Sequence, residues 1–385
     1  MIQAPRHPAR VWPFEMLEQR LLDSAAEGLV SVQREGPLAL FCYSKEAVYS
    51  REWTPAVRLA RGLVLDLDAR RVVATPWPKF WNLGESPTPG EPAPTLPAEP
   101  FEVFDKLDGS LIVIWHWGGR WRCSTKGSFN SPQAHWAAAR IAELDRQQLE
   151  CLTPGATYLC EAIYAENRIV IHYPEDRLHL LAAYHEDGRE FSYAELFAVA
   201  AGLRHSWPLV ARLQEPSIAA LLAQVPELPA DREGFVLRFE SGLRLKIKGE
   251  AYLRIHRAVS RLTPLAVWEH LAAGNLAESL RRELPEEFWL DFDRIHMLLL
   301  EEFSNHHRLL QVLVEHTTKL EDKALGLALQ SGKFRGEPLA KLLFTARKQP
   351  ERVEARLWEL IRPTGNQLEG YRPGSAITRV QQEVG

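Results

Sequence analysis

The sequence contains few cysteines and no long apolar run. Four of its 385 residues are cysteines, and they form neither a C-x-x-C pair nor a zinc-site spacing: Cys42, Cys123, Cys151 and Cys160. No stretch approaches the roughly 20 apolar residues of a transmembrane helix, and the N-terminal MIQAPRHPAR has no apolar signal-peptide segment. These absences predict reduced thiols in a soluble, cytoplasmic protein without membrane contacts.

The sequence also has no excess of positive charge. Lysine and arginine number 46 against 50 aspartates and glutamates, which gives a formal net charge of −4. A nucleic-acid partner would therefore have to be bound by a local patch rather than attracted by the whole protein. The motif G-x-x-x-x-G-K-[ST] is absent as well, which argues against a P-loop kinase fused to this sequence.

At this length we expect two domains. Apolar or alternating runs at 38–44, 62–68, 157–164 and 167–173 predict strands, and 112–125 and 233–249 predict hairpins that turn at glycines. Apolar residues from Ile295 to Phe303 recur at helical spacing. We therefore predict an α+β protein, with an antiparallel-sheet domain at 1–252 and an all-helical domain at 253–385. The six prolines within 86–100 predict an extended surface loop.

The segment FEVFDKLDGSLIVIW, residues 101–115, carries charges inside an otherwise apolar run. Its apolar residues predict a buried strand, and residues two apart on a strand point to the same side. We therefore expect Lys106 and Asp108 to project together from one strand face. Two alternatives are a surface ion pair on a strand edge and a hairpin turn at Asp108-Gly109.

Other charged residues lie on segments that also look buried. Glu161 follows the apolar Tyr158-Leu159-Cys160, and Lys246 and Lys248 lie on one face of their strand. Burial of several charges is tolerated when they face one another or a charged ligand. The whole set predicts a site for a polyphosphate and a divalent metal ion. Its cations are Arg61, Lys79, Lys126, Lys246 and Lys248.

These residues resemble the motifs of the lysine-dependent nucleotidyltransferases, which include polynucleotide ligases and mRNA capping enzymes. More narrowly, the chain resembles ATP-dependent RNA ligases of the T-even phage RNA ligase 1 type. Lys106-Leu107-Asp108-Gly109 matches the nucleotidyl-lysine motif K-x-D-G, followed by the Ser110 typical of RNA ligases. Six other segments match the family in order across residues 61–248: RGLVLD, PKFWNLGE, STKGS, LCEAIYAENRIVIHY, EGFVLR and LKIK.

The resemblance implies a nucleotidyl-transfer mechanism. The Lys106 amine would attack the α-phosphorus of ATP and form lysyl-AMP. AMP would then pass to an RNA 5′-phosphate, and an RNA 3′-hydroxyl would attack that end and expel AMP. Lys246 and Lys248 would hold the α-phosphate and disfavour a third positive charge on Lys106. Asp108 would orient the nucleophile.

The same resemblance implies the remaining site residues. Glu161 would contact the ribose or a metal-bound water, and Glu233 would bind Mg²⁺ or Mn²⁺. The choice of ATP over GTP rests on the resemblance alone. The other nucleotide-binding residues would be Arg61, Lys79, Gly109 and Lys126.

The expected partner is RNA with 5′-phosphate and 3′-hydroxyl ends, in RNA repair, and a separate kinase or phosphatase would prepare ends that need processing. A DNA ligase or capping-type enzyme is an alternative, but its fifth motif is normally followed by an OB-fold, whereas the sequence after Lys248 looks helical. A non-catalytic RNA- or nucleotide-binding protein on a ligase scaffold is another alternative. The intact set Lys106, Glu161, Glu233, Lys246 and Lys248 argues against it.

Overall fold

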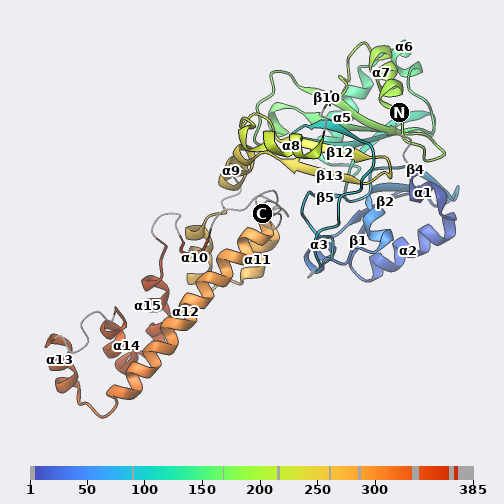
Figure 1. Ribbon diagram of the computed structural model, residues 1–385. Coiled ribbons are helices and arrows are strands. Elements are labelled where there is room, and N and C mark those ends of the chain that lie inside the picture. The colour runs from blue at the N-terminus through green and yellow to red at the C-terminus, as the bar shows by residue number, and fades with distance from the viewer. Residues whose placement is uncertain are drawn as a thin grey trace. The chain divides into compact units, whose positions relative to one another are not determined.

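A computed structural model of the chain describes residues 5–88, 91–167, 169–214, 217–259, 262–284, 288–331, 338–363 and 368–371 (Figure 1). It contains two compact units, Met1–His256 (the N-terminal unit) and Arg257–Gly374 (the C-terminal unit). Three sheets lie in the N-terminal unit, and the described part of the C-terminal unit contains helices without strands. The predicted α+β class is confirmed, while the boundary at 252/253 stays a prediction.

The first sheet of the N-terminal unit has four antiparallel strands in the order β1-β2-β3-β4. One face is covered by nearby helices through buried side chains such as Leu17 and Leu21, which pack against Leu63. These elements are α1 (Pro8–Val11), α2 (Phe14–Ala26), β1 (Val30–Glu35), β2 (Leu38–Tyr43), α3 (Lys45–Ser50), α4 (Pro55–Leu59), β3 (Arg61–Asp66) and β4 (Arg71–Ala74).

A second antiparallel sheet has the order β10-β9-β7-β8. It packs against the first sheet through a cluster that includes Leu40, Val64 and Trp115, while Tyr158 and Leu196 belong to the core on its helix-covered face. The elements are β7 (Ser110–Trp117), β8 (Arg120–Thr125), α5 (Pro132–Ala142), α6 (Arg146–Glu150), β9 (Thr157–Ile163), β10 (Arg177–Tyr184) and α7 (Tyr193–Gly202).

The third sheet has the order β11-β6-β12-β13-β5, and its β13–β5 pair is parallel while its other pairs are antiparallel. Leu221 of α8 packs in the same core as Val103 and Phe235. The elements are β5 (Trp81–Asn82), β6 (Phe101–Lys106), β11 (Arg212–Leu213), α8 (Ile218–Gln224), β12 (Gly234–Phe239), β13 (Arg244–Lys248) and the following α9 (Glu250–Val259).

The predicted continuous strand at 101–115 is wrong. β6 ends at Lys106 in the third sheet, and β7 begins at Ser110 in the second sheet. Residues 107–109 therefore cross between two sheets, so Lys106 and Asp108 do not share a strand face. A hairpin is also excluded, because β6 pairs with β11 and β12 whereas β7 pairs with β8 and β9.

The strand predicted at 167–173 is also wrong. A short 3₁₀ helix, η1, spans Ala165–Asn167, and residues 169–173 form an irregular loop, while Arg168 lies outside the described residues. Both predicted hairpins are confirmed, with turns at Gly118-Gly119 and between β12 and β13. Residues 86–88 and 91–100 form no helix or strand, as expected of the proline-rich loop. All four cysteines are free thiols.

The C-terminal unit is built around the long helix α12 (Figure 1). Its core includes Leu310, Leu325, Leu343 and Leu357. No helix among the described residues is long and apolar enough to cross a membrane. The elements are α10 (Pro264–Ala272), α11 (Ala277–Glu283), α12 (Trp289–Thr317), α13 (Asp322–Gln330), η4 (Pro338–Leu342), α14 (Leu343–Lys348), η5 (Pro350–Arg352) and α15 (Val353–Leu360).

Candidate active site

Three neighbouring strands of the third sheet bring two lysines to either side of one carboxylate. In the strand register, Gly234 at the start of β12 pairs with Lys106 of β6 on one side and with Lys248 of β13 on the other. Glu233 precedes Gly234, so its side chain lies between the two lysines. Glu233 Oε1 is 2.8 Å from Lys106 Nζ and 3.0 Å from Lys248 Nζ.

The glycine after Glu233 is required by the backbone. Gly234 has φ = 145°, a conformation that residues with a Cβ atom rarely adopt. A Cβ atom there would also lie 1.9 Å from the carbonyl oxygen of Ile247. Gly234 therefore allows β12 and β13 to approach closely at the point where Glu233 and Lys248 meet.

The charge balance of this cluster makes Glu233 its electrostatic centre. Its side chain is only 3% exposed, and burial alone would raise its pKa, but the Lys106 and Lys248 ammonium groups outweigh burial and lower it. Glu233 is thus an ionised carboxylate shared by two cations. The Lys106 side chain is 21% exposed, so a substrate can reach it from solvent.

Glu161 of β9 lies next to the segment that carries Lys106. A Cβ atom on Gly109 would lie 3.0 Å from Glu161 Cγ and 2.5 Å from the carbonyl oxygen of Ala162. Glycine at 109 therefore lets the chain after Lys106 pack directly against β9. The role of Gly109 in this structure is to permit this close packing, which places Glu161 beside the segment that carries Lys106.

Burial raises the pKa of the Glu161 carboxyl to about 7, with Glu233 and Asp108 adding to the increase and Lys106 and Arg61 opposing it. Because its ordinary pKa is 4.5, folded protein binds more protons than unfolded protein between pH 4.5 and 7. We therefore expect this group to lower the free energy of unfolding by up to about 3 kcal/mol as pH rises through that window.

The Glu161→Gln variant should lose this pH dependence, since an amide does not titrate. Urea unfolding of both proteins at pH 5 and pH 7.5 measures the effect, and the difference between the proteins removes contributions from histidines. The variant should gain stability relative to the parent at the higher pH. Parallel pH profiles for the two proteins would contradict the prediction.

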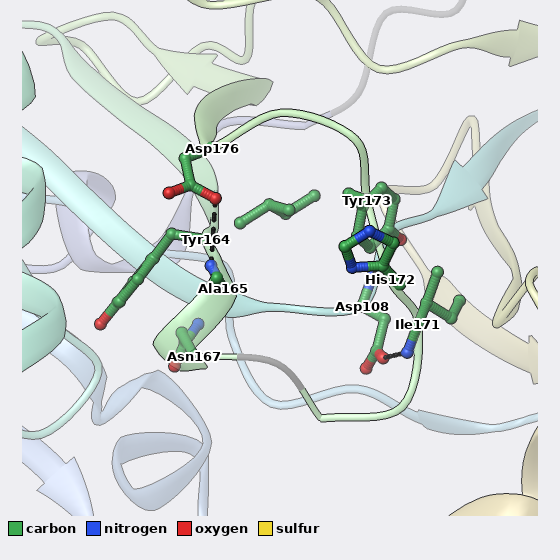
Figure 2. Close-up of a pocket in the computed structure, with 9 residues that line it drawn as sticks. Asp108, Tyr164, Ala165, Asn167, Ile171, His172, Tyr173 and Asp176 are labelled. Atoms are coloured by element: carbon green, nitrogen blue, oxygen red, sulfur yellow. Dashed lines mark hydrogen bonds between the residues drawn. The ribbon is translucent and has the colours of Figure 1, made fainter.

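Asp108 links three segments of the chain through hydrogen bonds. Its Oδ2 accepts hydrogen bonds from the backbone N–H groups of Val170 and Ile171, both at 2.9 Å, and its Oδ1 accepts one from the Tyr252 hydroxyl at 2.9 Å (Figure 2 draws the Ile171 bond). The Asp108 N–H donates to Tyr173 Oη at 3.0 Å. Through these four bonds, Asp108 holds the 169–173 loop and Tyr252 of α9 against the nucleophile segment.

Tyr252 was not identified from the sequence. It is four residues after Lys248, and the Lys248 Nζ lies 5.4 Å from the centre of its ring. The phenol thus contacts both the lysine of β13 and the carboxylate of Asp108. The signal available in the sequence was only its place one helical turn after the LKIK motif, which does not distinguish it from a core aromatic.

Three aromatic rings surround Lys79, whose side chain is only 5% exposed. Lys79 Nζ lies 5.1 Å from the ring centre of Trp53, 5.7 Å from that of Tyr43 and 5.8 Å from that of Trp81. Lys126 Nζ lies 5.5 Å from Tyr43. We call these five residues the cation–aromatic cluster. Trp81 is two residues after Lys79, but Tyr43 and Trp53 were missed because they come from segments that only the fold brings to this lysine.

Arg61 lies beside this cluster. Gly62, at φ = 96°, allows the start of β3 to lie close to the Lys126 backbone, because a Cβ atom there would be 3.0 Å from Lys126 Cα. The Arg61 guanidinium stacks 5.3 Å from the Phe80 ring centre, and its buried Nη1 has no hydrogen-bond partner among the described residues. A buried guanidinium donor without a partner fits an anionic oxygen of a ligand.

The sequence-predicted residues thus fall into two groups. Lys106, Lys248 and Glu233 are in direct contact, with Glu161 packed beside them. Arg61 and Lys126 lie together next to Lys79, and Arg61 also acts electrostatically on Glu161. Lys246 is partly buried two residues before Lys248, on the same face of β13. Lys126 is exposed directly after β8, the second strand of the hairpin that it was expected to follow.

The described residues contain no group of three or more histidine, cysteine, aspartate or glutamate side chains that could hold a metal ion. Glu161 and Glu233 instead offer two carboxylates beside several cationic side chains. Magnesium is commonly held by one or two carboxylates together with substrate phosphates and water. The donor set therefore fits a metal ion that arrives with a polyphosphate.

A protein-family model described as "RNA ligase" matches residues 59–252, half of the chain. A bacteriophage TS2126 protein, RNA ligase 1, is 28% identical over 43% of this chain, and a Thermovibrio ammonificans protein assigned as an RNA ligase is 28% identical over 64%. A protein of Autographa californica nuclear polyhedrosis virus, assigned as a bifunctional polynucleotide kinase/RNA ligase, is 27% identical over 54%. The matched regions cover 44%, 65% and 32% of those proteins, respectively, so the chain spans less than two thirds of each.

Proposed function

The chain belongs to the RNA ligase family of the T-even phage RNA ligase 1 type, and we propose that it is an ATP-dependent RNA ligase joining a 5′-phosphate to a 3′-hydroxyl. The observation that carries the proposal is the Lys106–Glu233–Lys248 cluster, with Glu161 packed beside it. A lysine amine next to a second lysine and two carboxylates provides a nucleophile, a phosphate ligand and metal ligands in one site.

In the first step, the Lys106 nitrogen forms a bond to the α-phosphorus of ATP while the bond to the pyrophosphate oxygen breaks. The Lys106 ammonium group loses one proton before attack and a second as the N–P bond forms, both to solvent, and its 2.8 Å ion pair with Glu233 has to open first. A metal ion on Glu233 would compete for that carboxylate and neutralise phosphate charge. Lys248 and Lys246 would hold the α-phosphate as charge develops on its oxygens.

The second and third steps reuse the same site. An oxygen of the RNA 5′-phosphate attacks the lysyl-AMP phosphorus, and the bond from phosphorus to Lys106 breaks. The 3′-oxygen of the other end then bonds to the RNA 5′-phosphorus, AMP leaves, and the hydroxyl proton passes to solvent. Over the three steps, one ATP is converted to AMP and pyrophosphate while the two RNA ends are joined.

The cation–aromatic cluster and Arg61 support the assignment of a polyphosphate. Arg61 acts electrostatically on Glu161 beside the nucleophile, and together with Lys79 and Lys126 it would suit the β- and γ-phosphates. The Arg61 Nη1 donor that lacks a partner among the described residues would be satisfied by one of their oxygens. The three aromatic rings around Lys79 attract its ammonium group and hold it in place. We assign Arg61, Lys79 and Lys126 to the leaving phosphates on this basis.

The proposed partners are RNA ends and a separate end-processing enzyme. One relative is assigned as a bifunctional kinase/ligase, which supports the idea that ends are prepared before this chain acts. The described C-terminal unit is helical rather than an OB-fold, which favours an RNA ligase over the DNA ligase and capping alternatives.

The function is tested by following label from α-³²P-ATP or α-³²P-GTP, with Mg²⁺, on a denaturing gel. The protein is first treated with pyrophosphate to remove bound AMP. We expect acid-labile protein label from ATP alone, which moves to RNA when a 5′-phosphorylated strand is added but not when the strand has a 5′-hydroxyl. Label from GTP alone would indicate capping-type chemistry, and no label from either would contradict a ligase.

A further inference from the structure

A pocket of about 120 Å³ lies beside Asp108, on the side of the loop that follows β9. Figure 2 shows Tyr164, Asn167 and Asp176 on one side and His172 and Tyr173 on the other. This volume is below the roughly 150 Å³ of a cavity that takes up a benzene ring, so the pocket would enclose only part of a planar group, with the remainder lying toward solvent past the exposed His172 and Asp176. Its lining residues are Asp108, Ile163, Tyr164, Ala165, Asn167, Ile171, His172, Tyr173 and Asp176.

The pocket wall is aromatic and uncharged or negative. Two tyrosines and His172 supply rings, and the described lining residues, which do not include Arg168 of the same loop, contain no lysine or arginine. One Asp176 oxygen accepts the Ala165 N–H at 3.0 Å, and the carboxylate is exposed to solvent. Such a wall disfavours a phosphate but suits the base and sugar of a nucleoside, because a carboxylate accepts hydrogen bonds from ribose hydroxyls.

A stack of rings extends from this pocket onto α5. Tyr164 lines the pocket and stacks on Trp136, with 4.4 Å between ring centres and an interplanar angle of 11°. The Arg140 guanidinium lies 5.5 Å from the Trp136 ring centre. Tyr164 and Trp136 cover one face of each other, so a base cannot lie between them, but the partly exposed Trp136 beside Arg140 offers a second aromatic surface on which a neighbouring base of a single strand could stack. ATP has one base, so an extended stack favours a polynucleotide as the occupant.

The pocket adjoins the nucleophile site through Asp108. This residue lines the pocket and is two positions after Lys106, and the charges of Glu161 and Glu233 both act on the Tyr173 hydroxyl. None of the phosphate-binding cations lines the pocket. An occupant would therefore lie next to the reacting phosphorus without occupying the proposed phosphate site.

We infer that this pocket binds the terminal nucleoside of the RNA strand whose 3′-hydroxyl attacks. The base lies between the rings of the pocket, and Asp176 accepts a hydrogen bond from the terminal ribose. The identity of the bound strand as the one that attacks rests on the proposed ligase function, but binding of an RNA end to the pocket does not require catalysis.

Two exposed lining residues provide variants that leave the core intact. His172→Ala removes a ring, and Asp176→Asn retains an oxygen for the Ala165 N–H while it removes the charge. Glu175→Gln is the matched control, because Glu175 is adjacent, does not line the pocket and pairs with Arg177 on the surface.

Binding is measured by fluorescence anisotropy with a short RNA that carries hydroxyls at both ends and therefore cannot be adenylylated. We expect each pocket variant to bind about tenfold more weakly than the parent, and Glu175→Gln to match the parent. A 2′-deoxy terminal nucleotide should weaken binding to the parent but cause no further loss with Asp176→Asn. Unchanged affinity in both variants would overturn the inference.

Kinetics separate this inference from the proposed function. With pre-adenylated donor RNA, the pocket variants should raise the KM for the acceptor strand about tenfold, while lysyl-AMP formation from ATP stays at the parent rate. A raised KM for ATP would instead place the ATP base in the pocket. If the parent forms no lysyl-AMP, the ligase proposal fails, while the anisotropy result still decides whether the pocket holds an RNA end.

Discussion

Replacement of Lys106 by alanine or by arginine is expected to remove all transfer of label from α-³²P-ATP to the protein. Alanine has no nucleophile, and the guanidinium of arginine is not deprotonated at neutral pH, so neither can form the bond to the α-phosphorus. Loss of the attacking group commonly costs several orders of magnitude, and we expect a fall of at least about 10³-fold in single-turnover labelling. Arginine also keeps a positive charge opposite Glu233, so this variant separates lost chemistry from lost folding.

The control for this experiment is Lys45→Ala, which removes an exposed lysine of α3, outside the strands that carry Lys106 and Lys248. Its labelling should equal that of the parent. Lys106→Arg should still seal pre-adenylated RNA at a measurable rate, because the third step does not need the lysine nucleophile. Undiminished protein labelling in either Lys106 variant would identify another residue as the nucleophile.

Replacement of Glu233 by glutamine should damage both stability and activity. The amide has the same shape, but it leaves the ammonium groups of Lys106 and Lys248 facing each other without a negative charge between them. Removal of one partner from a buried ion pair typically costs about 3–5 kcal/mol. We expect the free energy of unfolding in urea to fall by about that amount, with 21% exposure of Lys106 placing the effect at the lower end.

Activity should fall as well, by about 10²-fold or more in lysyl-AMP formation, if Glu233 also binds the metal ion. The matched control is Glu227→Gln, an exposed glutamate before the same strand. Raising the Mg²⁺ concentration should recover part of the activity of Glu233→Gln but none of its stability without nucleotide. A variant that unfolds and reacts like the parent would show that the shared carboxylate has no role.

At the K-x-D-G segment, the sequence predicted the lysine but not its position between two sheets. The sequence marked Lys106 as special because a lysine interrupts an apolar run, which is a local property. It did not show that the chain leaves one sheet at Lys106 and enters another at Ser110, because a buried strand and a buried crossing have the same apolar composition. Asp108 was expected beside the lysine and instead holds the 169–173 loop and Tyr252.

Contacts between distant segments were also beyond the sequence. Tyr43 and Trp53 reach Lys79 and its neighbour Trp81 only through the tertiary fold. Residues 167–173 look like a strand by composition, but the backbone N–H groups of Val170 and Ile171 bond to the Asp108 carboxylate. Tertiary hydrogen bonds outweighed local propensity there.

The sequence by itself determined the class of fold, both hairpins, the ordered motifs and the family, because alternation, turn glycines and motif order are encoded in neighbouring residues. Only the tertiary structure decided which charges pair, since Lys106 meets Glu233 and Lys248 through the pairing of β6 with β12, which lie more than a hundred residues apart in the sequence. The same holds for the pocket beside Asp108, whose walls form where a loop is held by a buried carboxylate. Register and burial depend on the whole fold, and for that reason they set the chemistry of this site.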